Sequence, residues 1–405
     1  MTSERAHWII LTPSYPPDQG GIADYTLVLA KELAARGDAV DIWTGPRSGD
    51  AAPLVPGISV FHLPTHFTPS GCRILEREIA RLPCPKRILV QYAPQPFGPR
   101  PQSRFKGLPF LFCLWLRRQK AAPVWLMIHE AETTNFAGMP WQMRLLHRLS
   151  DRMLGFTLST AQRVFYSMPA WEHVLRRHQT SATFEYLPVP SNIATRISPL
   201  EIRNSRNRLL DSNSRYVLGH FGTYSREITE LLHPVLQEVL QNQPHVQVLL
   251  IGQGSCEFAT QLRSFNRRVI ATGALESRQV AAHLAACDLL VQPFPDGAST
   301  RRGSIMAGIA LGIPVLSNAG ASSESVWIET GALALAGIET MPQRIARLLD
   351  DPEQRESIGA AGQILYQQRF SLDRTVETLR TVPHTGAKVP TPSAPKAPHD
   401  PRCAP

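Results

Sequence analysis

Short runs of apolar residues alternate along most of the chain with longer stretches in which apolar residues recur every three or four positions. Residues 8–11 (WIIL) form such a run, and from Ile22 to Leu33 the apolar side chains fall on one face of a helix. Short runs without a polar face are typical of strands buried on both sides of a parallel sheet. The predicted strands comprise residues 7–12, 40–43, 87–92, 123–128, 164–167, 216–221, 247–251, 269–273, 289–291 and 313–316.

The order of strand and helix repeats in two halves, which predicts an α/β protein with two Rossmann-like, doubly wound parallel sheets. Residues 204–215 (NSRNRLLDSNSR) are polar and rich in turn formers, so we place the domain boundary near 192–215. We assign residues 1–195 and 196–366 to the two domains. Residues 383–405 are rich in Pro, Ala and Lys with scarcely any large apolar side chains, which predicts a disordered tail.

The formal net charge of +9 is concentrated in the first half, where residues 1–195 carry 21 Lys and Arg against 14 Asp and Glu. A basic surface favours an acidic partner, such as a phosphorylated substrate or an anionic membrane surface. No RNP-like, zinc-finger or helix-turn-helix pattern is present, so we expect no nucleic acid partner.

The six cysteines form no C-x-x-C pair, which favours a reducing cytoplasm and argues against disulfides and a zinc site. No stretch reaches the ~18–20 apolar residues that span a bilayer, and the N-terminus lacks the pattern of a signal peptide. We therefore predict a cytoplasmic protein, either soluble or peripheral at the inner face of the membrane.

A polar loop at residues 292–304 follows the predicted strand 289–291 and precedes a helical pattern that begins at Ile305. The free N–H groups and the dipole at a helix start favour an anion, and guanidinium groups match phosphate oxygens in pairs. The loop therefore predicts a phosphate or diphosphate site, the alternative being arginines that are solvated or paired with acids. Its candidate ligands are Ser299, Thr300, Arg301, Arg302, Gly303 and Ser304.

Two other strand ends carry candidate binding residues. Gly20 and Gly21 lie between the first strand and its helix, where they offer open N–H groups and close backbone approach, or only a tight corner. His129 and Glu130 follow the strand 123–128, at the carboxyl end where α/β folds place ligands. The alternative for His129 is a hydrogen-bonded structural histidine.

Residues 100–120 (RPQSRFKGLPFLFCLWLRRQK) are apolar in the centre and basic at both ends. Aromatic side chains between cations are typical of a segment that lies in the interface of an anionic membrane. Because the centre is apolar all round, a buried helix with basic ends is the favoured interpretation.

Two stretches resemble family 4 glycosyltransferases, which are retaining enzymes with the GT-B fold. Residues 13–44 (PSYPPDQGGIADYTLVLAKELAARGDAVDIWT) are similar to the start of the family, and residues 285–315 (AACDLLVQPFPDG…MAGIALGIPV) are similar to its nucleotide-binding segment. The resemblance covers most of residues 7–378. It implies two Rossmann-like domains that face a cleft, with a last helix within residues 367–382 that crosses back to the first domain.

In the family, the loop that corresponds to residues 13–21 lies against the transferred sugar and the acceptor. The resemblance therefore implies that Gly20 and Gly21 bind the donor and that Tyr15 lies on the acceptor side. His129 is similar to a family histidine that faces the donor sugar, and Glu130 beside it is expected on the acceptor side.

The chain departs from the family in the carboxylates that hold the donor. Two family glutamates eight positions apart correspond here to Ser299 and Ala307. Asp296 is then the remaining carboxylate of the loop. It either hydrogen-bonds a ribose or sugar hydroxyl or caps its Asp-Gly turn.

The family's diphosphate clamp, an Arg and a Lys, corresponds here to Thr223 and Ile228. In their place we expect Arg226, in the loop that begins at Gly222, to bind the diphosphate together with the arginines of the loop at residues 292–304. No metal and no further cofactor are expected, because arginines and a helix N-terminus supply the positive charge.

The resemblance implies transfer of a sugar, with retention, from a nucleotide-sugar donor to a hydroxyl of a glycan, lipid-linked or small-molecule acceptor. The missing glutamates keep open a catalytically inactive GT-B protein that acts as a partner or scaffold. A GT-B enzyme of another reaction, such as a sugar epimerase or a phosphorylase, and a protein that binds membrane surfaces are the remaining alternatives.

Overall fold

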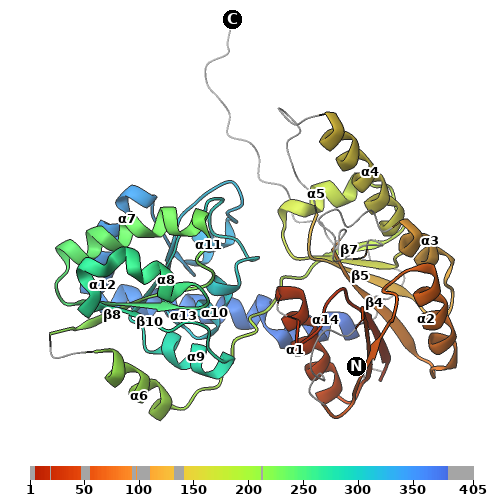
Figure 1. Cartoon of the computed structure of the whole chain (residues 1–405), viewed down its shortest axis with the longest axis horizontal. Coiled ribbons are helices and arrows are strands. Elements are labelled where there is room, and N and C mark those ends of the chain that lie inside the picture. Colours follow the sequence, from red (N-terminus) through yellow and green to blue (C-terminus); the bar gives the residue numbers. More distant parts are fainter. Residues whose placement is uncertain are drawn as a thin grey trace, which may run out of the picture.

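The computed structural model describes residues 5–18, 20–46, 55–93, 97, 110–131, 141–210 and 213–381. Two α/β lobes lie side by side, each with its own sheet (Figure 1). This architecture confirms the predicted pair of parallel-sheet Rossmann-like domains. The predicted disordered tail at 383–405, and the first part of the apolar stretch at 100–109, lie outside the described residues.

The first sheet is parallel throughout and has the order β3-β2-β1-β4-β5-β6-β7. Its central strands are the predicted apolar runs. The edge strands β3 and β7 were not predicted, because their side chains are partly exposed and the apolar run is broken. The strands are β1 (His7–Leu11), β2 (Ala39–Thr44), β3 (Ile58–His62), β4 (Lys86–Tyr92), β5 (Val124–Ile128), β6 (Arg163–Tyr166) and β7 (Thr183–Tyr186).

The second sheet is also parallel, in the order β10-β9-β8-β11-β12-β13. The chain order reverses between β8 and β11, which is the switch point at which such sheets bind ligands. The two-residue strand β13 has no sequence signal of its own. The strands are β8 (Tyr216–Phe221), β9 (Val246–Ile251), β10 (Val269–Ala271), β11 (Leu289–Gln292), β12 (Val315–Ser317) and β13 (Ala334–Leu335).

Helices cover both faces of each sheet, as a parallel sheet requires (Figure 1). In the first lobe they are α1 (Gly21–Ala35), α2 (Pro69–Arg81), α3 (Phe110–Arg118), α4 (Trp141–Leu158) and α5 (Ala170–Arg176). In the second they are α6 (Pro199–Leu209), α7 (Arg226–Asn242), α8 (Ser255–Ala259), α9 (Ser277–Ala285), α10 (Gly303–Ala310), α11 (Val326–Thr330), α12 (Met341–Asp350) and α13 (Pro352–Leu365), followed by α14 (Leu372–Arg380).

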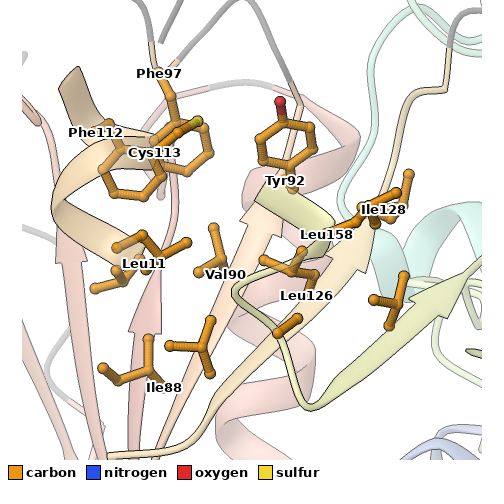
Figure 2. Packing of buried hydrophobic residues seen from close by; sticks show 14 of the residues in the cluster. Leu11, Ile88, Val90, Tyr92, Phe97, Phe112, Cys113, Leu126, Ile128 and Leu158 are labelled. Atoms are coloured by element: carbon orange, nitrogen blue, oxygen red, sulfur yellow. The ribbon is translucent and has the colours of Figure 1, made fainter. Parts of the chain in front are cut away.

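One face of the first sheet packs against α3 (Figure 2). Leu11, Ile88, Val90 and Leu126 point to this face from three adjacent strands, and Phe112 of α3 covers them. All five side chains are almost completely buried. Burial of apolar surface on this scale is the main contribution to the stability of the lobe.

The polar segment predicted as a domain boundary contains a helix. Ser198 accepts a hydrogen bond from the Glu201 N–H, and the Glu201 carboxylate accepts one from the Ser198 N–H (2.9 Å), which caps α6 on both sides. Arg278 of α9 binds the same carboxylate, and Arg206 binds Asp288. The capping sequence S-P-x-E was the available signal for this helix.

The apolar stretch forms a helix that is buried on one side only. Phe112, Cys113 and Leu116 of α3 are buried, whereas Phe110 and Leu111 are exposed. The predicted helix is present, but its apolar residues are divided between the core and the surface. None of the helices among the described residues combines the length and apolar character needed to cross a membrane.

The chain crosses back from the second lobe, and α14 packs on α1 of the first (Figure 1). Arg163 at the start of β6 donates hydrogen bonds to the carbonyl oxygens of Thr378 (3.2 Å) and Thr381 (2.8 Å) at the end of α14. Its guanidinium also lies 4.7 Å from the ring centroid of Trp125. A buried cation thus satisfies carbonyl groups that the helix end leaves without partners.

Replacing Arg163 with Met tests this attachment. We expect the free energy of unfolding in urea to fall by about 3 kcal/mol, because two hydrogen bonds from a charged donor to α14 and the ion pair with Glu185 are lost. Arg374→Met, which removes an exposed arginine from α14 itself, is the matched control and should change the value by less than about 0.5 kcal/mol. Equal effects of the two substitutions would contradict a specific role of Arg163.

Candidate active site

Two adjoining cavities lie at the carboxyl edges of the sheets. One cavity, about 490 Å³, lies between the ends of β8 and β11 and the starts of α7 and α10, and we call it the donor-lobe cavity because the resemblance in sequence leads us to expect the donor there. The inter-lobe cavity, about 510 Å³, is lined by Gly20, Gly21, His129 and Glu130 from the first lobe and by Arg301 and Gly303 from the second. Asn192, Arg301 and Gly303 line both cavities.

The donor-lobe cavity is positively polarised. The first residues of α10, Gly303 and Ser304, line it, and so does Ser225, which precedes α7. Two helix N-termini therefore point their free N–H groups toward one space. A side chain built at Gly222 or Gly303 would meet no atom within 4 Å, so the backbone at both positions is open to a ligand.

The arginine loop, residues 299–302, leads into α10. Hydrogen bonds between Thr300 and residues of both lobes fix its position. Thr300 Oγ1 accepts a hydrogen bond from Tyr186 Oη (3.0 Å) of the first lobe and donates one to Glu324 Oε1 (2.8 Å) of the second. The carbonyl oxygen of Ser167 lies 3.2 Å from the same hydroxyl, and the Thr300 N–H also donates to Glu324. A fully buried hydroxyl with partners on both sides fixes where this loop lies.

Glu324 is the buried carboxylate of this network. Burial raises its pKa, and the two hydrogen bonds from Thr300 oppose the shift. Its second oxygen, Oε2, has no partner within the described residues. Through its two hydrogen bonds with Thr300, Glu324 anchors the arginine loop to the second lobe.

Arg302 is oriented by two contacts. It forms an ion pair with Asp296, and its guanidinium lies 4.4 Å from the centroid of the Phe294 ring. The first contact neutralises charge, and the second fixes the plane of the guanidinium. Arg302 lines the donor-lobe cavity from this position.

Arg301 is the less constrained cation of the pair. It is exposed, and it lines both cavities. A long, flexible cation at the junction of two cavities can follow a charge that lies between them.

His129 lines the inter-lobe cavity in a neutral form. Burial lowers its pKa to about 4, and its Nε2 lies 2.6 Å from Gln91 Oε1. With Nε2–H as the donor to that oxygen, Nδ1 is left to accept a hydrogen bond. Tyr25 packs edge-on against the ring and helps to fix its orientation.

Two buried side chains that line the donor-lobe cavity carry unpaired polar atoms. His220 Nδ1 donates to the Val291 carbonyl (2.8 Å), which leaves Nε2 as an acceptor without a partner among the described residues. Both amide atoms of Gln292 also lack a partner there. Buried polar atoms are rarely left in this state, so a ligand or water is expected to meet them.

Five predicted ligands lie away from both cavity walls, and one of them is the fully buried Thr300 described above. Arg226 is exposed and pairs with Glu230 (2.7 Å), one turn along α7. Tyr15 is buried in the core of the first lobe, and burial raises its pKa to about 12. The Ser299 side chain is buried without a partner among the described residues, and Asp296 is occupied by the guanidinium of its own loop.

The remaining predicted residues lie where ligands can reach them. The sequence interpretation missed Glu227, Asn192, Gln292 and Glu324, which line the donor-lobe cavity or support its loop. Gln292 carried a signal, because it is a polar residue at the end of an otherwise apolar strand. Within the described ranges, no group of three or more His, Cys, Asp or Glu is placed to hold a metal ion.

Comparison with known proteins assigns both lobes. Residues 20–190 match the glycosyl transferase 4-like domain, and residues 215–351 match the domain called glycosyl transferases group 1. The GDP-mannose-dependent monoacylated alpha-(1-6)-phosphatidylinositol monomannoside mannosyltransferase of Corynebacterium glutamicum is 24% identical over 291 residues, which cover 65% of this chain and 74% of that protein.

Solved structures share the fold. Sucrose-phosphate synthase from Thermosynechococcus elongatus superposes with a TM-score of 0.65 at 18% identity, over 93% of this chain and 97% of that one. HepE from Anabaena, solved with UDP and glucose, gives a TM-score of 0.60 at 17% identity, over 92% and 99%. These likenesses confirm the arrangement of two parallel-sheet lobes.

The buried histidines predict a loss of stability in acid. Burial lowers the pKa of both His129 and His220 to about 4, below the usual value of about 6.5. Between these two pH values the unfolded chain binds protons on the histidines and the folded chain does not. The free energy of unfolding should therefore fall as the pH drops from about 6.5 toward 4. Each histidine should contribute a slope of about 1.4 kcal/mol per pH unit.

Urea unfolding at several pH values measures this slope. His129→Gln and His220→Asn keep the hydrogen-bonding nitrogen in place but cannot titrate, so each should flatten the slope relative to the unsubstituted protein. His173→Gln replaces an exposed histidine of α5 and should leave the slope unchanged. Parallel slopes in all four proteins would contradict burial of neutral imidazoles.

Proposed function

Because the chain belongs to the family 4-type glycosyltransferases with the GT-B fold, we propose that it transfers a sugar from a nucleotide-sugar donor to an acceptor hydroxyl. The observation that carries the proposal is that Arg301 and the first residue of α10 line both cavities. A diphosphate bound at this junction would place its nucleoside in the donor lobe and its sugar between the lobes.

The donor-lobe cavity suits a nucleoside diphosphate. Two helix N-termini and two arginines supply positive charge, and backbone N–H groups are open at Gly222 and Gly303. The names of the similar proteins support a donor of this class, since one uses GDP-mannose and another was solved with UDP and glucose.

Glu227 and Gln292 are the groups that we assign to the nucleoside or sugar hydroxyls. Glu227 lines the cavity from the first turn of α7 and is its one carboxylate among the described residues. The unpaired amide of Gln292 can both donate and accept a hydrogen bond. These side chains take over the role of the two glutamates that are absent at positions 299 and 307.

The inter-lobe cavity suits the transferred sugar and the acceptor. Neutral His129 offers an acceptor nitrogen to a sugar hydroxyl, and Gly20 and Gly21 allow close approach of the backbone. The departing diphosphate gains negative charge as the glycosidic bond breaks, and the α10 N-terminus with Arg301 and Arg302 stabilises it. The acceptor proton passes to that phosphate on the same face of the sugar, which gives retention without a metal.

Removing the two arginines tests the diphosphate site. We expect the Arg301→Ala, Arg302→Ala double variant to bind UDP- or GDP-sugar at least about tenfold more weakly in calorimetry, the loss of about one charge-assisted hydrogen bond. Arg226→Ala, which removes an exposed arginine outside the cavity wall, is the matched control and should bind normally. Unchanged affinity in the double variant would contradict the assignment.

Transfer in the presence of EDTA tests the chemistry. With an α-linked nucleotide-sugar and a simple acceptor, we expect an α-linked product by proton NMR, at a rate within about twofold of that without EDTA. A β-linked product would contradict retention. A rate that collapses in EDTA and returns with Mg²⁺ would contradict metal independence.

A further inference from the structure

Two neighbouring helices of the first lobe expose large apolar side chains. Phe110 and Leu111 of α3 are 54% and 51% exposed, and Trp141, Leu145 and Leu149 of α4 are 66%, 50% and 39% exposed. Residues 141, 145 and 149 are four apart and therefore form one stripe along α4. Half of the ten large hydrophobic side chains that are exposed in the described part of the chain belong to this set, which we call the apolar ridge.

Arginines lie beside the ridge on the same helix. Arg144, Arg148 and Arg152 are exposed and follow the ridge residues of α4 by three positions, so the two stripes adjoin. No ion pair or hydrogen bond joins these guanidinium groups to another described residue. Asp151, the acidic residue of α4, is paired with His178 instead.

The ridge begins on the edge of the first sheet that also carries the inter-lobe cavity. In a parallel sheet, a helix that follows a strand begins at the carboxyl edge of that sheet. The starts of α3 and α4, which carry Phe110 and Trp141, therefore lie toward the edge at which His129 and Glu130 line the cavity. In Figure 1, α3 and α4 stand at the periphery of the first lobe, with α5 beside α4.

We propose that the apolar ridge and the arginine stripe of α4 dock the protein on a bilayer that contains anionic lipids. The apolar side chains enter the interfacial layer, and the arginines bind lipid phosphates. This inference rests on the proposed function and extends it: an acceptor cavity held close to a membrane fits a lipid-linked hydroxyl acceptor.

The charge of the surface distinguishes a bilayer from a second copy of the chain. In a twofold dimer across this face, the arginine stripe would meet itself or lie close to its own copy, and like charges would repel. An anionic bilayer neutralises every arginine at once. The mixture of aromatic, aliphatic and cationic side chains is typical of an interfacial helix.

Flotation of the full chain with vesicles tests the docking. We expect binding to phosphatidylcholine vesicles that contain about 30% phosphatidylglycerol, little binding to pure phosphatidylcholine, and weakening by salt. The triple variants Trp141→Ala, Leu145→Ala, Leu149→Ala and Arg144→Glu, Arg148→Glu, Arg152→Glu should each lose at least about tenfold in binding. Unchanged thermal unfolding would show that the variants are folded.

Matched controls lie on the second lobe. Ile328→Ala with Ile364→Ala removes two apolar side chains that are more than half exposed, and Arg263→Glu with Arg267→Glu reverses two exposed charges. Both controls should float like the unsubstituted protein. Equal loss in the controls, or binding that ignores lipid charge, would overturn the proposal.

Donor binding in solution separates this inference from the proposed function. A protein that binds the nucleotide-sugar without vesicles but does not float retains the proposed function and overturns the docking surface. A protein that floats through the ridge but binds no nucleotide-sugar has the docking surface without the proposed function. A change of oligomeric mass in the ridge variants, with flotation intact, would mean that a second copy covers the ridge and would overturn the proposal.

Discussion

The buried hydroxyl of Thr300 is the contact on which the arrangement of the site depends. It belongs to the second lobe, yet it bonds to Tyr186 and lies against the Ser167 carbonyl of the first. Because this buried hydroxyl has partners in both lobes, it holds the arginine loop at the place where the two lobes meet. The neighbours of Thr300 in sequence, Arg301 and Gly303, are thereby brought to the junction of the two cavities.

Carboxylates with different partners organise this positive region. Asp296 forms an ion pair with Arg302, and Glu324 accepts hydrogen bonds from Thr300. Glu227 lines the donor-lobe cavity from α7. Two of the three are occupied by the arginine loop itself. The backbone of the loop is therefore fixed with Arg301 and the N-terminus of α10 at the donor-lobe cavity, which is the preorganisation that a departing anion requires.

The strands that could be predicted from the sequence are those that are buried on both faces of a sheet. Strands β1, β5 and β11 are apolar apart from one terminal residue of β1 and of β11, and their runs predicted both parallel sheets. Edge strands β3 and β7 are half exposed and gave no such signal. The helix α6 was missed because its polar sequence was interpreted by composition, whereas its capping box at Ser198 and Glu201 determines the structure.

The site was predictable only in part. Position at a strand end indicated His129, and the loop before α10 indicated Arg301 and Arg302. The pairing of Arg226 with Glu230 follows from helical spacing and could have been predicted. The contact of Glu324 with the arginine loop could not, because Glu324 reaches that loop from a later segment. Tyr15 was assigned by its loop, but its side chain packs into the core.

A crystal structure of the protein with bound UDP-sugar or GDP-sugar tests the central claim most directly. The account predicts the diphosphate between the N-terminus of α10 and Arg301, with the sugar directed toward His129. A nucleotide bound elsewhere, or an Arg301 side chain turned away from the diphosphate, would contradict it.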